Sequence, residues 1–205
     1  MLLRVRRYSA VVWGALVLSV AVGDVQAEAP QMSSALPNPG TPGSPLDPEV
    51  RRVADGVSLP ITSMQQLIRL SRPQLDQLYQ QSSPGAVPPG RVRGRVIVSP
   101  GSRLSVPASR VVRLMWQGKV FNSADSTAVN RFFGIRIIKG KVYYGESWLD
   151  GRPSLILDYS ETSRLYAPYR DEIREVAPGL FLGLMYERTA PQATFKMYFA
   201  LESVQ

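Results

Sequence analysis

Strict alternation of apolar and polar residues after Gly90 limits most strongly what this chain can fold into. In residues 180–187 and 194–201, large apolar side chains recur at every second position, which is the period of a strand with one buried face. A turn signal such as Asp150-Gly151 follows each alternating segment, so successive strands should pair antiparallel. We count about seven strands, enough to curl into a barrel. The sequence therefore predicts a mainly β (α+β) fold, an antiparallel meander with short helices before and within it.

Helical spacing is confined to short stretches, which are residues 63–70, 71–79, 107–116 and 123–132. In the second stretch Pro73 suits the first turn of a helix. Ser123 or Asp125 suits the N-cap of the fourth, which Gly134 would close. In the third stretch four apolar residues are expected to be buried, namely Val111, Val112, Leu114 and Met115.

The first 27 residues predict a cleavable signal peptide, with a basic start, an apolar stretch over 10–22 and the site Val25-Gln26-Ala27. That stretch is shorter than the roughly 20 apolar residues that cross a bilayer, so we expect no stable membrane span after cleavage. The chain has no cysteine, which a lipid anchor at the new N-terminus would require. We therefore expect a periplasmic or secreted protein whose mature chain begins at Glu28.

The mature chain divides by composition into two parts. Residues 28–59 are expected to form a disordered proline-rich linker, since six prolines between positions 30 and 48 alternate with small and polar residues. Residues 60–205 are expected to form a single β-barrel-like domain, and that length suffices for a core without cross-links.

The absence of histidine and cysteine narrows the chemistry. It excludes disulfides, every Ser-His or Cys-His nucleophile, and the commonest metal ligand, so we expect no metal and no cofactor. The remaining catalytic candidates are Asp158 and Glu146, which could serve a carboxylate and tyrosine-dependent hydrolase or isomerase. Asp158 has a simpler role as the cap of the turn that runs through Ser160. We expect a binding protein rather than an enzyme.

Aromatic side chains crowd the meander, and four of them could line a site for an apolar ligand: Trp116, Tyr144, Trp148 and Tyr159. The competing interpretation is that these side chains are core and its rim.

The whole chain carries a formal charge of +8, and this charge is unevenly distributed. Residues 91–141 hold eleven basic and one acidic residue, whereas residues 146–187 hold eight acidic and four basic. We prefer the interpretation that early and late strands lie side by side and pair their charges. Within the later half, four alternating charges are expected to form a solvated, salt-paired face: Arg170, Glu172, Arg174 and Glu175. The alternative to this pairing of early with late strands is a basic ridge, formed by Arg91, Arg93 and Arg95, that contacts an anionic envelope lipid or polysaccharide. No nucleic-acid partner is expected of an exported protein.

Residues 116–121, 144–151, 157–160 and 170–180 resemble a little-characterised exported bacterial family with a calycin or lipocalin-like β-barrel. The resemblance covers roughly the last 115 residues and implies a fold more than an activity. It supplies no catalytic residues.

These patterns favour an extracytoplasmic binding protein for a small lipophilic or amphipathic molecule. The two alternatives from other classes are the carboxylate-dependent enzyme and an interaction module that docks on the envelope through its arginines.

Overall fold

The computed structural model describes residues 61–204. The predicted signal peptide, the predicted linker and the boundary at residue 60 lie outside the described residues. Within residues 61–204, no helix combines the length and the apolar character that a membrane crossing requires.

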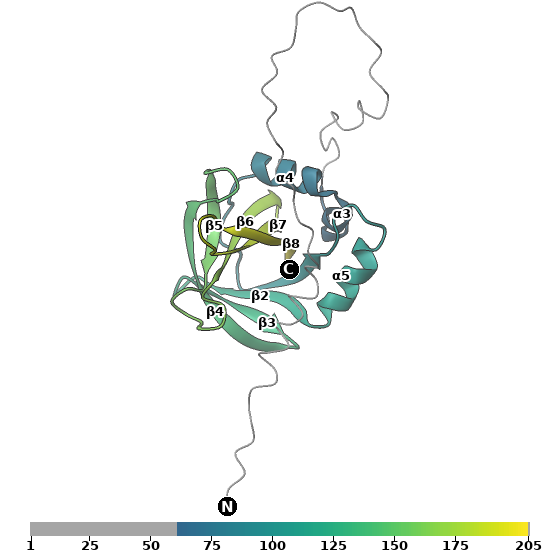
Figure 1. Ribbon diagram of the computed structural model, residues 1–205. Coiled ribbons are helices and arrows are strands. Elements are labelled where there is room, and N and C mark those ends of the chain that lie inside the picture. The colour runs from purple at the N-terminus through teal and green to yellow at the C-terminus, as the bar shows by residue number, and fades with distance from the viewer. Residues whose placement is uncertain (1–60, 205) are drawn as a thin grey trace, which may run out of the picture.

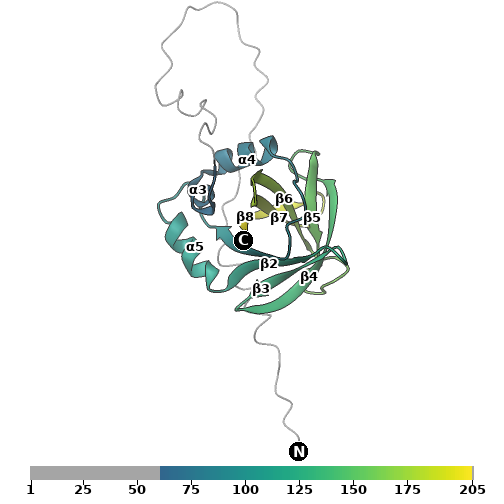
Figure 2. The same ribbon diagram turned by 180° about the vertical axis from the view of Figure 1, so that it is seen from behind.

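Eight strands form a closed antiparallel barrel in which every strand pairs with its neighbours in sequence and β1 closes against β8 (Figures 1 and 2). Their bounds are β1 Arg91–Ile97, β2 Trp116–Asn122, β3 Thr127–Phe132, β4 Ile135–Glu146, β5 Pro153–Asp158, β6 Tyr169–Ala177, β7 Leu180–Glu187 and β8 Thr194–Ser203. The predicted mainly β, antiparallel meander with short helices is confirmed. It has eight strands rather than about seven, and the additional strand is β3.

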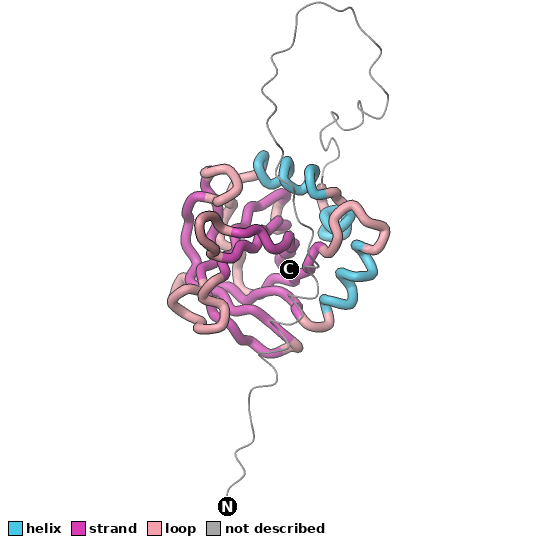
Figure 3. Tube along the Cα trace, in the orientation of Figure 1, coloured by secondary structure: helices cyan, strands magenta, loops and turns pink. Residues whose placement is uncertain are grey.

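Three helices accompany the barrel in the described part of the chain: α3 Met64–Arg69, α4 Arg72–Gln81 and α5 Ser105–Arg113. Figure 3 shows them along one side of the ring of strands. Reciprocal hydrogen bonds between Ser63 and Gln66 cap α3, and Pro73 occupies the first turn of α4 as predicted. Helix α5 lies in the connection between β1 and β2.

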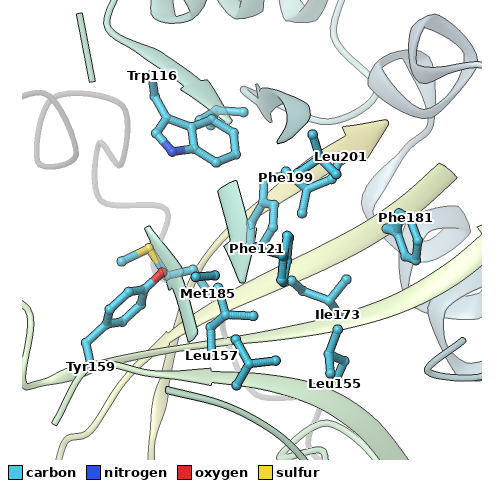
Figure 4. Close-up of a cluster of buried hydrophobic side chains, with 14 of the residues drawn as sticks. Trp116, Phe121, Leu155, Leu157, Tyr159, Ile173, Phe181, Met185, Phe199 and Leu201 are labelled. Carbon is cyan, nitrogen blue, oxygen red and sulfur yellow. The ribbon is translucent and has the colours of Figure 1, made fainter. Parts of the chain in front are cut away.

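Two hydrophobic clusters stabilise this arrangement. The first fills the barrel interior, where side chains from facing strands, such as Phe121, Leu157 and Phe199, point toward one another (Figure 4). The second lies outside the barrel, where Leu67 of α3 and Leu75 of α4 belong to one cluster with Leu182 of β7. Strands β7 and β8 are therefore buried on both faces, so the single buried face expected from their alternation is wrong; strands covered on both faces read as nearly continuous apolar runs, as in Leu180–Glu187.

The predicted helix over 123–132 is wrong, because Thr127–Phe132 is strand β3. Asp125 does cap, but it caps the turn of a hairpin: its Oδ1 accepts a hydrogen bond from Thr127 Oγ1 at 2.5 Å. Ala128 and Phe132 point into the core with the period of a strand. The local N-cap signal is the same for a helix and for a tight turn, and pairing with β2 decides between them.

The burial expected for the third helical stretch is wrong for Val111 and Leu114, whereas Val112 is partly buried and packs against the interior cluster. Helix α5 ends at Arg113, and it buries its serines Ser105 and Ser109. Val111 and Leu114 are 61% and 72% exposed. Helix α5 meets the barrel with Val106 and Val112 as well as its serines and leaves Val111 on the outer face, and periodicity alone cannot show which face meets the core.

Candidate functional site

Two of the four aromatic residues predicted to line a ligand site lie together inside the barrel. Trp116 and Tyr159 are both buried in the interior cluster. The ammonium nitrogen of Lys119 lies 5.5 Å from the ring centre of Trp116 and 5.7 Å from that of Tyr159. The indole N–H of Trp116 donates to Asn130 Oδ1 at 3.0 Å. The two rings therefore both lie beside the same buried polar cluster.

This cluster is centred on Lys119, a lysine of β2 that sequence reasoning missed. Its ammonium group donates to Asn130 Oδ1 at 2.8 Å, to Tyr159 Oη at 2.9 Å and to Asp171 Oδ2 at 2.7 Å. Tyr159 in turn donates to Asp171 Oδ2 at 2.6 Å. All three ammonium protons have acceptors, which is the condition for a charge to be tolerated in a core. Lys119 lies two residues before Phe121 on β2, so both side chains point to the same, inward face of the strand. That spacing was the one sign in the sequence that Lys119 would be buried.

Burial shifts the pKa values of Lys119 and Tyr159 in this cluster. It lowers the pKa of Lys119, while the facing carboxylate of Asp171 acts in the opposite direction. Burial and then the charge of Asp171 raise the pKa of Tyr159 well above its usual value, so this phenol stays a hydrogen-bond donor. We interpret the cluster as a structural link between β2, β3 and β6 across the barrel.

The other two predicted aromatic residues lie on the surface. Tyr144 is 53% exposed, and its hydroxyl donates to the carbonyl of Gly85 at 3.0 Å. Trp148 is 40% exposed and carries two guanidinium groups, Arg170 at 4.3 Å and Arg188 at 5.6 Å from its ring centre. The structure therefore does not bring the four aromatic residues into one site.

The two catalytic candidates are separated at opposite ends of the β4–β5 hairpin, since Glu146 pairs with Pro153 and Asp158 with Lys141. Asp158 caps its turn as predicted, because Oδ1 accepts from Ser160 N at 2.9 Å.

The charge environment of Asp158 matches this role. Its Oδ2 pairs with Arg188 at 2.7 Å. Burial opposes ionisation of Asp158, but the hydrogen bonds from Ser160 and the charge of Arg188 outweigh it and lower its pKa. This carboxylate is held ionised by structural partners, and that is the opposite of what a general acid needs.

The expected solvated face on β6 is wrong, because Arg170, Glu172 and Arg174 are all buried. Arg174 uses all five of its N–H donors: Nε and the two terminal nitrogens reach both oxygens of Asp150 at 2.7 Å and three backbone carbonyls, including that of Tyr79. Arg174 thereby joins β6 to α4, whereas Glu172 accepts hydrogen bonds from Ser147 and Trp148 and forms an ion pair with Arg170 at 3.3 Å.

The basic excess of residues 91–141 divides into two groups in the structure. Four members form ion pairs with acidic residues: Arg93 with Glu202, Lys119 with Asp171, Lys139 with Asp125 and Lys141 with Glu161. Seven others form no ion pair with any residue in 61–204: Arg91, Arg95, Arg103, Arg110, Arg113, Arg131 and Arg136. The preferred pairing of early with late charges thus holds for some of these residues and leaves an arginine surplus.

Three of these arginines and Arg69 line one groove of about 570 Å³. Arg69 comes from the last turn of α3, Arg95 from β1, and Arg110 and Arg113 from the last turn of α5. Figure 1 shows α3 and α5 as neighbours on the same side of the barrel. The remaining lining residues are two glutamines and three apolar residues, Ile68, Val106 and Leu114, with no carboxylate among them.

The positive charges that line this groove repel one another. Partial burial, followed by the charges of Arg113 and Arg110, lowers the pKa of Arg95. A guanidinium group nevertheless keeps its proton at neutral pH. The groove therefore holds several positive charges that an anion would neutralise. We take it as the candidate functional site, and refer to it as the arginine groove.

Of the three arginines predicted to form a basic ridge, only Arg95 belongs to the arginine groove. Arg93 pairs with Glu202, and Arg91 lies beside Arg131, whose pKa it helps to lower after burial. Sequence reasoning found the basic excess but could not place Arg69, which joins the groove through the packing of α3 against α5.

Comparisons with known proteins add a likeness but no family. No family model and no curated protein matches the chain. Among solved structures, the chain is similar to a protein from Thermomonospora curvata at 20% identity and a TM-score of 0.46, over 76% of this chain and 97% of that one.

Proposed function

We propose that this protein is an exported binding protein that holds the acidic group of an amphipathic molecule in the arginine groove. The proposal keeps the class of function expected from the sequence, and it moves the site from the aromatic residues to the groove between α3, α5 and β1.

The observation that carries the proposal is the convergence of four arginines on one groove to which residues 61–204 contribute no carboxylate. Guanidinium groups bind phosphate and carboxylate through paired N–H donors, and each hydrogen bond to a charged group contributes about 1.5–3 kcal/mol. Burial of Arg95 strengthens such a bond, because water competes less for the donors. A bound anion would also relieve the mutual repulsion of Arg95, Arg110 and Arg113.

The amphipathic character of the ligand is inferred from the apolar part of the groove. Ile68, Val106 and Leu114 lie among the arginines, so a short alkyl segment attached to the anion would have apolar side chains to contact. Each methylene buried there would contribute about 0.8 kcal/mol. A volume of about 570 Å³ lies within the range of ordinary small-molecule sites and suits a head group with the first part of a chain.

Two sequence features support the same class of ligand. The predicted signal peptide would place the protein where envelope lipids and their breakdown products occur. The resemblance to calycin or lipocalin-like barrels favours a carrier or sensor of small amphipathic molecules over an enzyme.

Isothermal titration of the purified protein with decanoate, decyl phosphate and decanol, each below its critical micelle concentration, tests the proposal. We expect saturable 1:1 binding of the two anions and much weaker binding of the alcohol. The Arg95→Gln variant should weaken binding of the anions at least about tenfold, since one charged hydrogen bond is lost. Raising the salt concentration should weaken it further.

The matched control is Arg164→Gln, which removes the same charge from an exposed position outside the groove. It should leave the affinity within about a factor of two, because distant surface charges are largely screened. Equal binding of decanol and decanoate, or equal losses in Arg95→Gln and Arg164→Gln, would show that the groove is not an anion site.

A further inference from the structure

Large apolar side chains are exposed at one end of the barrel. Five of the ten that the described residues expose lie on α5, at its two caps, or at the β3–β4 turn and the first residue of β4: Leu104, Val111, Leu114, Phe133 and Ile135, each 53% to 72% exposed. We call this surface the apolar tip. Scattered exposed apolar residues are ordinary, but a concentration of half of them on two adjoining segments indicates a contact surface.

The two segments of the apolar tip are tied together. The backbone N–H of Phe133 donates to the carbonyl of Met115 at 2.9 Å, just beyond the last turn of α5. Trp116 pairs in register with Phe132 at the adjoining strand ends. Figures 1 and 2 agree in placing the end of the β3–β4 hairpin beside the chain that leaves α5. A helix and a hairpin tip therefore present their apolar side chains from one rigid frame.

The hairpin tip has a phenylalanine at a position where its backbone conformation favours asparagine or glycine. Phe133 has a φ of 50° and Gly134 a φ of 81°, which is the pattern of a two-residue turn with both central residues in the left-handed region. Asn-Gly is the preferred sequence there, and a bulky residue at positive φ is unusual. Phenylalanine is unfavourable at this position for two reasons. Its backbone is strained at positive φ, and its ring is 53% exposed to water. A contact made by the ring would explain it.

Arginines surround the apolar tip. Arg103, Arg110 and Arg113 lie on or beside α5, while Arg131 and Arg136 stand directly opposite each other on β3 and β4. Two like charges in register repel, and Nη1 of Arg131 is buried without a hydrogen-bond partner among residues 61–204. No acidic residue lies on the chain between 91 and 124, and Asp125 is occupied by Lys139. A negatively charged partner would complement the charge of this surface.

We infer that the apolar tip inserts into the interface of an anionic lipid bilayer, with the surrounding arginines on the phosphate groups. Apolar residues on a short helix, beside arginines with long aliphatic stems, are the pattern of helices that lie in the head-group region. At 1.5 Å per residue, α5 is only about 14 Å long, so the hairpin tip supplies a second anchor. Anionic lipid attracts each arginine near its surface, and salt weakens that attraction.

Leu114 belongs to both the apolar tip and the arginine groove, and Arg110 and Arg113 line the groove while they lie beside the tip, so docking would place the groove beside the lipid from which an acidic amphiphile could enter. The bilayer contact itself needs no occupant in the groove. It therefore extends the proposed function without depending on it.

Flotation with lipid vesicles tests the inference. Vesicles of phosphatidylcholine with 30 mol% phosphatidylglycerol should bind the purified protein, and vesicles of pure phosphatidylcholine should bind it at least tenfold more weakly. The variant Val111→Gln/Phe133→Asn changes two residues of the apolar tip that do not line the arginine groove. It should bind the anionic vesicles at least tenfold more weakly than the unchanged protein.

This variant is designed to fold. Asparagine is preferred at the turn position of Phe133, and glutamine is a better helix former than Val111, so the urea unfolding midpoint should be equal or higher. Leu165→Gln, an exposed apolar residue outside the apolar tip, is the matched control and should leave vesicle binding within twofold.

The decanoate titration separates the two proposals. In the Val111→Gln/Phe133→Asn variant, decanoate affinity should be unchanged while vesicle binding is lost. Equal binding to neutral and anionic vesicles, or unchanged vesicle binding in the variant, would overturn the inference. Capture of nucleic acid by the arginines with no binding to either vesicle would also overturn it.

Discussion

Removing one charge of the Lys119–Asp171 pair should be among the most damaging single changes in the barrel. The two side chains are 2% and 4% exposed, and Nζ lies 2.7 Å from Oδ2. Lys119→Met leaves the carboxylate of Asp171 buried with only the hydroxyl of Tyr159 as a donor. An uncompensated buried charge costs about 3–5 kcal/mol. This is a large share of the roughly 5–15 kcal/mol that stabilises a typical domain.

The double variant Lys119→Met/Asp171→Asn should recover most of this loss. Both charges are gone, and the new amide oxygen can still accept from Tyr159, so what remains is the cost of an unpaired buried amide N–H, about 1–3 kcal/mol. Urea unfolding monitored by tryptophan fluorescence measures all four corners of the cycle. We expect a coupling free energy of about 3 kcal/mol, at the upper end of the range for residues in contact.

The exposed pair Lys139–Asp125 provides the control for this cycle. Its side chains are 49% and 43% exposed at 3.0 Å, so Lys139→Met should cost less than about 1 kcal/mol. If Lys119→Met costs no more than Lys139→Met, or if the two changes at Lys119 and Asp171 are additive, the buried cluster does not link the strands as we describe.

Two further predictions test the packing and the charges of the fold. Gly183→Ala should cost about 1–3 kcal/mol, since a Cβ there would meet the ring of Phe199 at 2.1 Å, and the urea midpoint reports it; an unchanged midpoint would show that the ring is free to move. Asp158→Asn should be less stable than the unchanged protein at pH 7. The pKa of Asp158 is lowered in the folded state, so its stabilising effect is present above its ordinary pKa of 3.8 and is lost as the pH falls through the lowered value. The difference between the two proteins should therefore vanish in acid, and a difference that persists there would assign it to packing instead of charge.

The strands of the barrel could be predicted where one face of the sheet is apolar. In 180–187 and 194–201 the large apolar residues at every second position predict β7 and β8, but the apolar residues between them belong to the opposite face, which packs on the other cluster. Strand β3 was missed because Asp125 gives the same local signal for a hairpin turn as for a helix. Only pairing with β2, which lies outside any local window, distinguishes the two.

The candidate site was predictable in its chemistry but not in its location. The excess of arginine between 91 and 141 is visible in the sequence, and of the ridge Arg91, Arg93 and Arg95 that it suggested, one residue, Arg95, lines the groove. Which arginines remain without an acidic partner depends on registers such as that of Arg93 with Glu202. The exposure of Leu114 could not be inferred either, because an apolar residue on a helix predicts burial until the face that meets the barrel is known.

The most direct test of the central claim is to locate a bound anion among the arginines. In an NMR titration of the ¹⁵N-labelled protein with decyl phosphate, the Nε–H signals of Arg69, Arg95, Arg110 and Arg113 should shift together and saturate at one equivalent. The signal of Arg174, which is already fully hydrogen-bonded, should stay in place. Shifts that centre on Arg188 beside Trp148, or that spread over all exposed arginines without saturating, would contradict the account.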